Sequence, residues 1–481
     1  MPSPADLFME NWELARKWSG PDVQNFKLPC PEFKRAVGES LLIPSASDSY
    51  EALKNLQRGD DPAVLNGRIM YVLAAIDDFF EIVHPRTLNR SKLFDRIPLS
   101  HWMRKIVLER LDNGAFSSTQ NHQLVPRGPL VRSPRGDFAS SAYSFLDQFA
   151  FLTVVRTELL IDERPIRVST IAKDRSLSQG LGMAPSSSGS EKVAFIPIAQ
   201  LDEHLLIERV ERNGHAYIDF KLSEDIDAAA VIDSVLCDIG YADIVMSAEL
   251  MVDARAADRL SPLISAKPGR TRILLAGSGN TIETRDGLPW NETRVFNGSG
   301  VELWRQRKMW QAGLDTPRSE DLGLVPGNNG RLMEHNHAGD EVVVADLDGF
   351  GRCVVLICQD IKSSPLASQL IKLYQPDWVF VPILDWGTAI ARWAHVEAFQ
   401  LSDFSPARFL IASSLSMVEK LKKEEQPCGL AIGPKQSTEQ NPGRECATAY
   451  AKTSPHGFGM VEWQTGWGKS ALMFDPKKEP E

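Results

Sequence analysis

A cysteine at the end of an apolar run is the first residue of this sequence that could do chemistry. The segment 353–358, CVVLIC, predicts a buried strand, and Cys358 is followed at once by the polar pair Gln359 and Asp360. A helix is predicted over 365–374, so the thiol is expected at a strand-to-helix turn, the edge where open α/β sheets bind ligands. A lone cysteine is more often a small buried hydrophobe. Cys358 is therefore a candidate nucleophile only if other reactive groups accompany it.

Charged residues upstream could supply what a thiol nucleophile needs. Glu249 comes at the end of an apolar strand pattern, and Lys308 lies in a strand-like segment flanked by tryptophans. A thiol attacks as the thiolate, so a nearby carboxylate can take its proton and an ammonium can stabilise the anion. Glu334 is a second candidate carboxylate, and Glu341, seven residues further on, is the alternative. Singly, such residues are more often surface acids or lysines whose stems cover apolar surface. Together with Cys358 they indicate a catalytic site.

The order of these residues resembles the carbon–nitrogen hydrolase (nitrilase) superfamily. GFGRCVVLICQD, residues 349–360, is similar to the nucleophile segment of that family. SAEL, residues 247–250, matches its strand-end glutamate, and RQRKMW, residues 305–310, matches its lysine. Residues 366–386 look like the helix and strand that follow the nucleophile. The resemblance covers roughly residues 191–420.

The resemblance implies a role for each of these side chains in hydrolysis without a metal or an organic cofactor. Cys358 would be the nucleophile, and Glu249 its general base and later the general acid for the departing amine. The developing oxyanion needs preorganised donors, which Lys308 and the backbone N–H of Gln359 would supply. Glu334 matches by spacing the second glutamate that orients the substrate or supports the lysine in many family members.

The elements predicted around these residues form an α/β domain. After residue 190, continuous Val/Ile/Leu runs typical of strands buried on both faces alternate with helical patterns. A layered α/β architecture is the expected class. The resemblance implies more specifically an α-β-β-α sandwich, and we assign residues 191–481 to this nitrilase-like domain.

Residues 1–190 are predicted to form a separate, α-rich amino-terminal domain. Apolar residues at three- and four-residue intervals predict helices over 62–83, 99–113 and 141–155. The small-residue, proline-containing stretch 180–192 marks the predicted boundary. We find no chemical motif in this domain, so its function cannot be read from the sequence.

Composition and charge favour a cytoplasmic enzyme. The 481 residues carry a net charge of −10, and the part after residue 190 holds 30 Lys and Arg against 41 Asp and Glu. That acidic surplus disfavours a nucleic-acid groove in the hydrolase domain and leaves the question open for the amino-terminal domain. No apolar run is long enough for a membrane helix, and the amino terminus does not have the order of a secretory signal. The six cysteines show no CxxC pattern, which indicates reduced thiols.

Other signals are weaker. His335 and His337 stand two residues apart without a third ligand at metal-site spacing, so a polar turn is expected there. Gly277 and Gly279 fall short of a dinucleotide fingerprint, and a tight turn explains them. His395 could enter the substrate pocket together with Glu397, although a helix histidine satisfied by its neighbours is the simpler interpretation.

The sequence thus predicts a thiol-dependent hydrolase of a small-molecule amide, or less readily a nitrile, that assembles as a homo-oligomer. Two other functions stay open. The domain could be an inactive sandwich that serves as a binding or assembly module, or an acyltransferase that uses the same thioester. Retention of all three residues of the triad speaks against the inactive module.

Overall fold

The computed structural model describes most of the chain as two compact units. The described residues are 1–18, 27, 29–59, 61–85, 100–128, 149–174, 190–212, 214–325, 330–363, 365–385, 387–405, 407–421, 426–435 and 445–463. Unit 1 comprises residues 1–159, 168–173 and 345–351, and unit 2 comprises residues 160–167, 174–344 and 352–481. The predicted boundary at 190 remains a prediction, because residues 175–189 lie outside the described residues.

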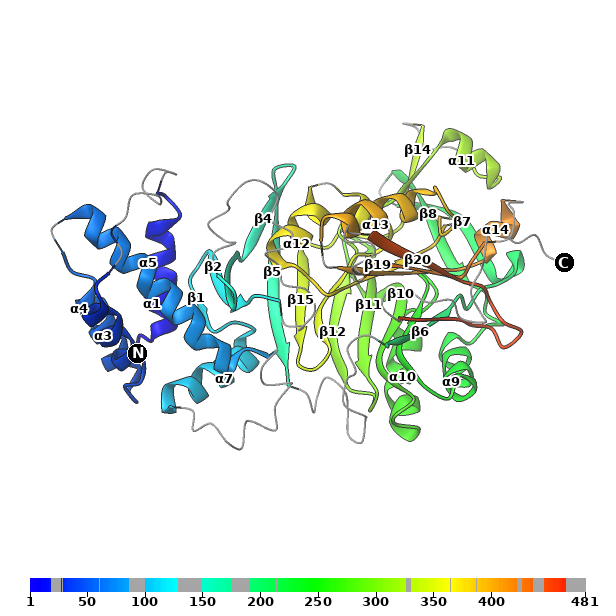
Figure 1. Cartoon of the computed structure of the whole chain (residues 1–481). Helices are drawn as coiled ribbons and strands as arrows, with labels where there is room; N and C mark the ends of the chain where they lie inside the picture. The colour runs from blue at the N-terminus through cyan, green and yellow to red at the C-terminus, as the bar shows by residue number, and fades with distance from the viewer. Residues whose placement is uncertain are drawn as a thin grey trace. The chain divides into compact units, whose positions relative to one another are not determined.

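Unit 1 combines helices with a small antiparallel sheet (Figure 1). Its helices are α1 (Pro4–Ala15), α3 (Pro31–Leu41), α4 (Ala46–Leu56), α5 (Pro62–Phe79), the 3-10 helix η1 (Phe80–Val83) and α7 (His101–Asn113). Its sheet has the order β1 (Ser117–Ser118), β2 (His122–Pro126), β3 (Leu152–Arg156). Aromatic side chains such as Phe8, Phe80 and Trp102 form its core.

The sequence-based helices of this unit are confirmed at α5 and α7, but the helix predicted over 141–155 is wrong in its described part. Leu152–Arg156 is strand β3, paired antiparallel with β2 so that Val154 lies opposite Leu124. Thr153, Val154 and Val155 are β-branched and fit a pleated surface better than a helix. Their run of apolar side chains is compatible with a helix or a strand, and the pairing with β2 makes this segment a strand.

Unit 2 contains a six-stranded sheet and most residues of an eight-stranded sheet. The six-stranded sheet has the order β12 (Glu302–Arg307), β11 (Leu288–Asn297), β10 (Thr271–Arg285), β9 (Ala242–Ser247), β6 (Lys192–Ile196), β21 (Gly459–Glu462). The eight-stranded sheet has the order β20 (Glu445–Ala451), β19 (Gly429–Lys435), β18 (Arg408–Ser413), β17 (Trp378–Ile383), β16 (Gly351–Val355), β15 (Glu341–Leu347), β5 (Arg164–Lys173), β4 (Glu158–Ile161). β10 and β17 are in contact, as are β18 and both β6 and β9, so the two sheets pack face to face.

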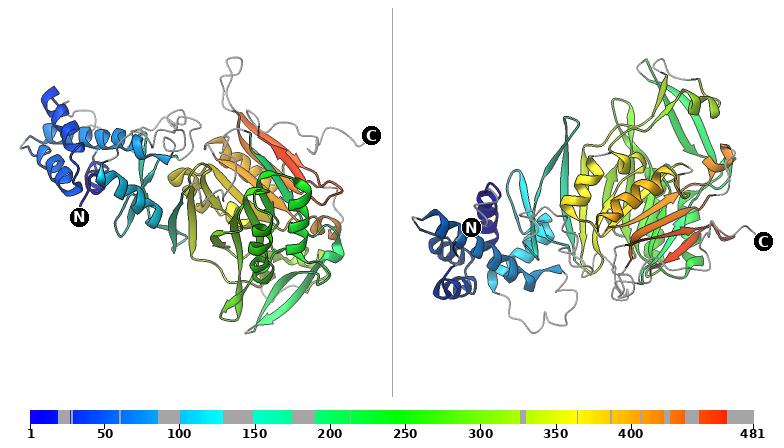
Figure 2. Two further views of the ribbon diagram at one scale, coloured as in Figure 1. Left: turned by 90° about the horizontal axis from the view of Figure 1, so that it is seen from below. Right: turned by 45° about the horizontal axis from the view of Figure 1, so that its top comes forward.

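Helices cover both outer faces of this pair of sheets (Figures 1 and 2). α9 (Ala228–Ile239) and α10 (Ala254–Ala266) pack on strands of the six-stranded sheet. α13 (Trp393–Asp403) packs on β18, β19 and β20, and α12 (Leu366–Tyr374) precedes it on the same side. The α-β-β-α sandwich expected from the sequence is therefore confirmed.

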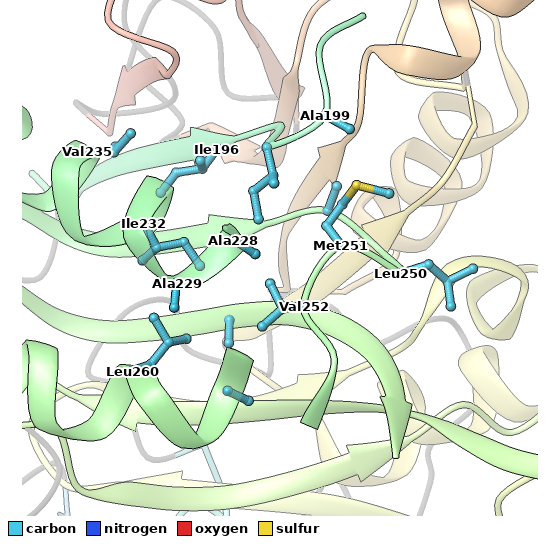
Figure 3. Packing of buried hydrophobic residues seen from close by; sticks show 14 of the residues in the cluster. Ile196, Ala199, Ala228, Ala229, Ile232, Val235, Leu250, Met251, Val252 and Leu260 are labelled. Carbon is cyan, nitrogen blue, oxygen red and sulfur yellow. The ribbon is translucent and has the colours of Figure 1, made fainter. Parts of the chain in front are cut away.

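An apolar cluster fills the space between the six-stranded sheet and its helices. Figure 3 shows Ile232 and Val235 of α9 and Leu260 of α10 directed toward the sheet, where Ile196 of β6 lies. All four side chains are at most 3% exposed. The three- and four-residue spacing of the apolar positions in α9 puts them on one face, which explains why this segment forms a helix against the sheet.

A smaller sheet adjoins the sandwich within unit 2. It has the order β13 (Gly313–Asp315), β14 (Arg331–Glu334), β8 (His215–Leu222), β7 (Leu205–Arg212), and α11 (Thr316–Asp321) follows β13. The short elements η5 (Asp202–His204), η6 (Cys358–Lys362) and α14 (Ser416–Lys420) complete the description. Among the described residues, no helix has the length and apolar character needed to cross a membrane.

Candidate active site

Cys358 stands in a tight turn just beyond strand β16. The strand ends at Val355, and the 3-10 turn η6 begins at Cys358 itself. Because β16, β17 and β18 are parallel, their carboxyl ends share one edge, and the turn after β16 lies there. Cys358 has a φ of 51°, in the left-handed region that side chains with a Cβ adopt only at an energetic cost. Its side chain is 6% exposed.

Lys308 lies at the centre of a buried ion-pair group. Its Nζ donates hydrogen bonds to Glu249 Oε1 at 2.7 Å and to Glu334 Oε2 at 2.6 Å. Lys308 follows directly after β12, and its backbone N–H donates to the carbonyl of Asn291 on β11. The hydrogen bond to β11 thereby fixes the backbone of Lys308, and the two carboxylates fix its ammonium group. The side chain is fully buried.

Glu249 connects the two large sheets at the site. It follows β9 of the six-stranded sheet, and its Oε2 accepts a hydrogen bond at 2.9 Å from the N–H of Leu384, which follows β17 of the eight-stranded sheet. Its Oε1 accepts a hydrogen bond from Asn291 Nδ2 at 3.0 Å and one from Lys308. The carboxylate also interacts electrostatically with the Cys358 thiol. Glu249, Lys308 and Cys358, far apart in sequence, are therefore brought together.

Glu334 is the fourth residue that the structure places at the site. Besides Lys308, its Oε2 accepts hydrogen bonds from the N–H of Ala312 at 3.1 Å and from Asn336 Nδ2 at 3.0 Å. The alternative, Glu341, is an ion-pair partner of Arg167, and its side chain is 31% exposed. The carboxylate that contacts the buried lysine is thus Glu334.

Two buried residues that support the site were given no role from the sequence. One is Asn291, described above, and the other is Asp360. Asp360 Oδ1 accepts hydrogen bonds at 3.1 Å from the N–H groups of Met309 and Trp310, and its Oδ2 accepts one from the N–H of Ile357, also at 3.1 Å. The carboxylate therefore joins the turn that carries Cys358 to the segment just after Lys308. An acid two residues after the cysteine was the available signal, whereas its backbone partners could not be read from a pattern.

Burial and charge shift the proton affinities of the group together. Burial, and next the negative charge of Glu249, raise the pKa of the Cys358 thiol well above its ordinary value, while Lys308 acts against them. Burial also raises the pKa of Glu249, and the ammonium of Lys308 opposes that rise. For Lys308, burial favours the neutral amine, but the two carboxylates outweigh it and hold the pKa well above its usual range. The thiol is consequently protonated at rest, with a carboxylate in place to take its proton.

A cavity of about 150 Å³ opens beside the thiol. Cys358, Gln359 and Glu334 line it together with side chains from the small sheet, α11, α14 and the loop after β17. The predicted oxyanion donor, Gln359, thus borders the same space as the sulfur. A substrate in this cavity would contact the Cys358 thiol, the Glu334 carboxylate and the turn at Gln359.

The weaker candidates lie elsewhere. His395 stacks on Phe399 and Tyr450, with ring centroids 5.9 and 6.2 Å away. His335 Nδ1 is 3.8 Å from a carboxylate oxygen of Asp219, and His337 Nδ1 contacts the carbonyl of the next residue. Within the described ranges, no group of three or more His, Cys, Asp or Glu side chains is arranged to hold a metal ion.

Gly277 and Gly279 have a structural explanation. A Cβ on Gly277 would collide with the backbone carbonyl of Ala248, and one on Gly279 with that of Val252. Gly277 also has a φ of 82°. The two glycines allow β10 to lie close to the backbone both before and after Glu249 in the turn that carries it.

Comparisons with known proteins give likeness in structure only. No protein-family model matches the chain, and no curated protein matches its sequence. Among solved structures, Saccharomyces cerevisiae Nit3, described as a member of branch 10 of the nitrilase superfamily, is similar at 15% identity and a TM-score of 0.38. The match covers 58% of this chain and 93% of Nit3.

Two further solved structures are similar over about the same share of the chain. Glutamine-dependent NAD+ synthetase from Acinetobacter baumannii matches at 13% identity and a TM-score of 0.36, over 60% of this chain and 49% of the synthetase. A nitrilase-superfamily amidase from Nesterenkonia AN1 matches at 12% identity and a TM-score of 0.35, over 59% of this chain and 90% of the amidase. Members of the superfamily that the sequence motifs resemble are thus among the structures similar to this chain. At these TM-scores, nothing about the chemistry of this chain follows from the likeness.

Proposed function

We propose that this protein hydrolyses a carbon–nitrogen bond of a small molecule, an amide more readily than a nitrile, through a thioester on Cys358. The observation that carries the proposal is the buried ion pair of Glu249 and Lys308, whose charges act on the Cys358 thiol where it lines a cavity. A buried nucleophile that interacts with a base, with the base held by a third group, is the arrangement of covalent catalysis.

Acylation begins when the thiol proton passes to Glu249. The sulfur then bonds to the amide carbon, and the carbonyl π electrons move to oxygen. Lys308 and the N–H of Gln359 are the donors proposed to stabilise this oxyanion. When the oxyanion collapses, the C–N bond breaks, and the leaving amine takes the proton from Glu249.

Deacylation uses the same carboxylate. Glu249, now ionised, accepts a proton from water as the water oxygen bonds to the thioester carbon. Collapse of the second tetrahedral species breaks the C–S bond, and the proton returns from Glu249 to the sulfur. The net reaction consumes one water and yields a carboxylic acid and an amine, so no external oxidant or reductant is needed.

Mass spectrometry of the intact protein, together with an ammonia assay, tests the proposal. Incubation with a panel of primary amides and nitriles is expected to add an acyl mass to the wild-type chain, to release ammonia, and to leave Cys358→Ala unmodified. An adduct that is released only when a nucleophilic amine such as hydroxylamine is added would indicate acyl transfer. Absence of any adduct across the panel would refute the enzyme proposal and favour the binding or assembly module.

A further inference from the structure

The walls of the cavity beside Cys358 are mostly apolar. Two side chains come from β8, one from β13 and one from α14. The others come from the residues that directly follow α11, α14 and β17. These residues are Ile218, Phe220, Leu314, Leu322, Leu384, Met417 and Leu421. Ile218, Phe220 and Met417 are at most 8% exposed, so they form a built apolar surface. Such a surface favours an acyl group that carries no polar atoms of its own.

The buried charges next to the sulfur include no surplus positive charge that could pair with a carboxylate of the substrate. Lys308 is paired with both Glu249 and Glu334, so one positive charge faces two negative ones. The net charge of Cys358, Glu249, Lys308 and Glu334 stays negative when the proton moves from Cys358 to Glu249. A substrate carboxylate placed near the reacting carbon would therefore be repelled and would lose its water without gaining a partner.

The outer rim of the cavity does not select for charge either. It presents two cations, Arg318 and Lys362, and two carboxylates, Asp321 and Asp385. Asp385 accepts a hydrogen bond from Trp393 Nε1 at 2.7 Å, and the Lys362 ammonium lies 5.6 Å from the centroid of that indole ring. Positive and negative groups are balanced at the rim, so the apolar interior determines what binds.

The volume limits the size of the group that fits. An apolar cavity of about 150 Å³ can hold a molecule of benzene size, which corresponds to about six carbon atoms. From the walls, the charges and the volume, we infer that the substrate is a neutral amide whose acyl part is an unbranched or ring-shaped apolar group of about six carbons. This inference rests on the proposed function, since it assumes that the acyl group binds where Cys358 can attack it.

A pair of matched amides tests the inference. Hexanamide carries a terminal methyl where adipamate, the half-amide of adipic acid, carries a carboxylate. From acetamide to hexanamide, kcat/KM is expected to rise roughly fourfold per added methylene group. Adipamate is expected to react about a hundredfold more slowly than hexanamide, or slower still. Turnover of adipamate at or above the rate of hexanamide would overturn the inference and leave the proposed hydrolase intact.

A binding measurement keeps the test independent of turnover. Cys358→Ala should retain the cavity, so hexanamide is expected to raise its melting temperature more than adipamate does at equal concentration. If hexanamide produced no shift, or adipamate the larger one, the assignment of a neutral apolar acyl group would be wrong even if the enzyme proved inactive.

Truncation of one wall residue locates the acyl group. Met417→Ala enlarges the cavity, so the preferred acyl chain is expected to lengthen by about two or three carbons. Met460→Ala is the matched control, because Met460 packs against the same apolar core without lining the cavity. An unchanged chain-length preference in Met417→Ala, or the same change in both variants, would contradict binding of the acyl group against Met417.

Discussion

The ammonium of Lys308 lies 2.6 Å from the carboxylate of Glu334, the last residue of strand β14. β14 belongs to the same small sheet as β8 and β13, which contribute Ile218, Phe220 and Leu314 to the cavity. The group that holds the lysine therefore sits on the same sheet as the residues that would contact the substrate. A shift of that sheet would move Glu334 and thereby change its ion pair with Lys308.

Glu334→Gln should lower kcat and move the acidic limb of its pH profile to lower pH. The negative charge of Glu334 helps to raise the pKa of Glu249, so its removal makes Glu249 a weaker base. A loss of about 10- to 100-fold in kcat is expected, at the lower end of what general-base catalysis contributes. Steady-state rates across pH measure both effects. Glu341→Gln is the control, and a similar change there would contradict the assignment of Glu334.

Glu249→Gln should separate the reactivity of the thiol from turnover. The negative charge of Glu249 is one cause of the raised pKa of Cys358. In the variant, more thiolate therefore forms at pH 8, and iodoacetamide should alkylate Cys358 faster. Amide hydrolysis should nevertheless fall by about 10²- to 10⁴-fold, because the base is lost.

Lys308→Met should change the alkylation rate in the opposite direction, since the ammonium lowers the pKa of the thiol. Peptide mapping is needed to follow Cys358 in both variants, because Cys30 and Cys237 are exposed and will also react. If Glu249→Gln and Lys308→Met altered alkylation in the same direction, the electrostatic explanation would fail.

Asp360→Asn should alter the pH profile because Asp360 acts through the segments that it joins. Burial raises the pKa of Asp360 to about 7, against the opposing hydrogen bonds from backbone N–H groups. Only the ionised carboxylate accepts all of these bonds, so activity should rise with pH through about 7 as the carboxyl group loses its proton. In Asp360→Asn the part of the limb near pH 7 should disappear, the part set by Glu249 should remain, and kcat should fall more than the apparent affinity for substrate. An unchanged profile in the variant would show that Asp360 only stabilises the fold.

Arg110→Met should destabilise unit 1. The guanidinium, on α7, donates to the Asp348 carboxylate at 2.9 Å, lies 3.7 Å from that of Asp346, and is 1% exposed. Removing it leaves two buried or half-buried carboxylates without this partner, which costs about 3–5 kcal/mol. Urea denaturation measures the free energy of unfolding. Arg104→Met, on an exposed position of the same helix, is the control and should change that free energy by less than about 0.5 kcal/mol.

The sequence was sufficient for residues whose position follows from a strand end. Cys358 and Glu249 each follow a continuous apolar run, so each could be placed at the carboxyl end of a strand. The expectation that both lie at the edge of one sheet is wrong, because β16 belongs to the eight-stranded sheet and β9 to the six-stranded sheet. The two residues meet because the sheets pack face to face, which no sequence pattern shows. The choice of Glu334 over Glu341 rested on spacing, whereas only the fold shows which carboxylate reaches Lys308. Asp360 binds backbone N–H groups about 50 residues away in sequence, and no local pattern encodes such a contact.

Short elements were the least predictable. β13 and β14 have three and four residues, too few for a period of two to be recognised, although they form part of the cavity wall. The error at Leu152–Arg156 has a related cause. An apolar run of that length is compatible with a buried helix or a strand, and only the partner strand decides.

The left-handed backbone of Cys358 affects which residue type suits this position. A cysteine in this conformation carries backbone strain that lowers the stability of the fold, whereas glycine adopts the same φ without that strain. Cys358→Gly would therefore relieve backbone strain of about 1 kcal/mol, at the loss of a small buried side chain. Under the proposed function, the reactivity of the thiol explains a cysteine at this position, because backbone strain alone would favour glycine.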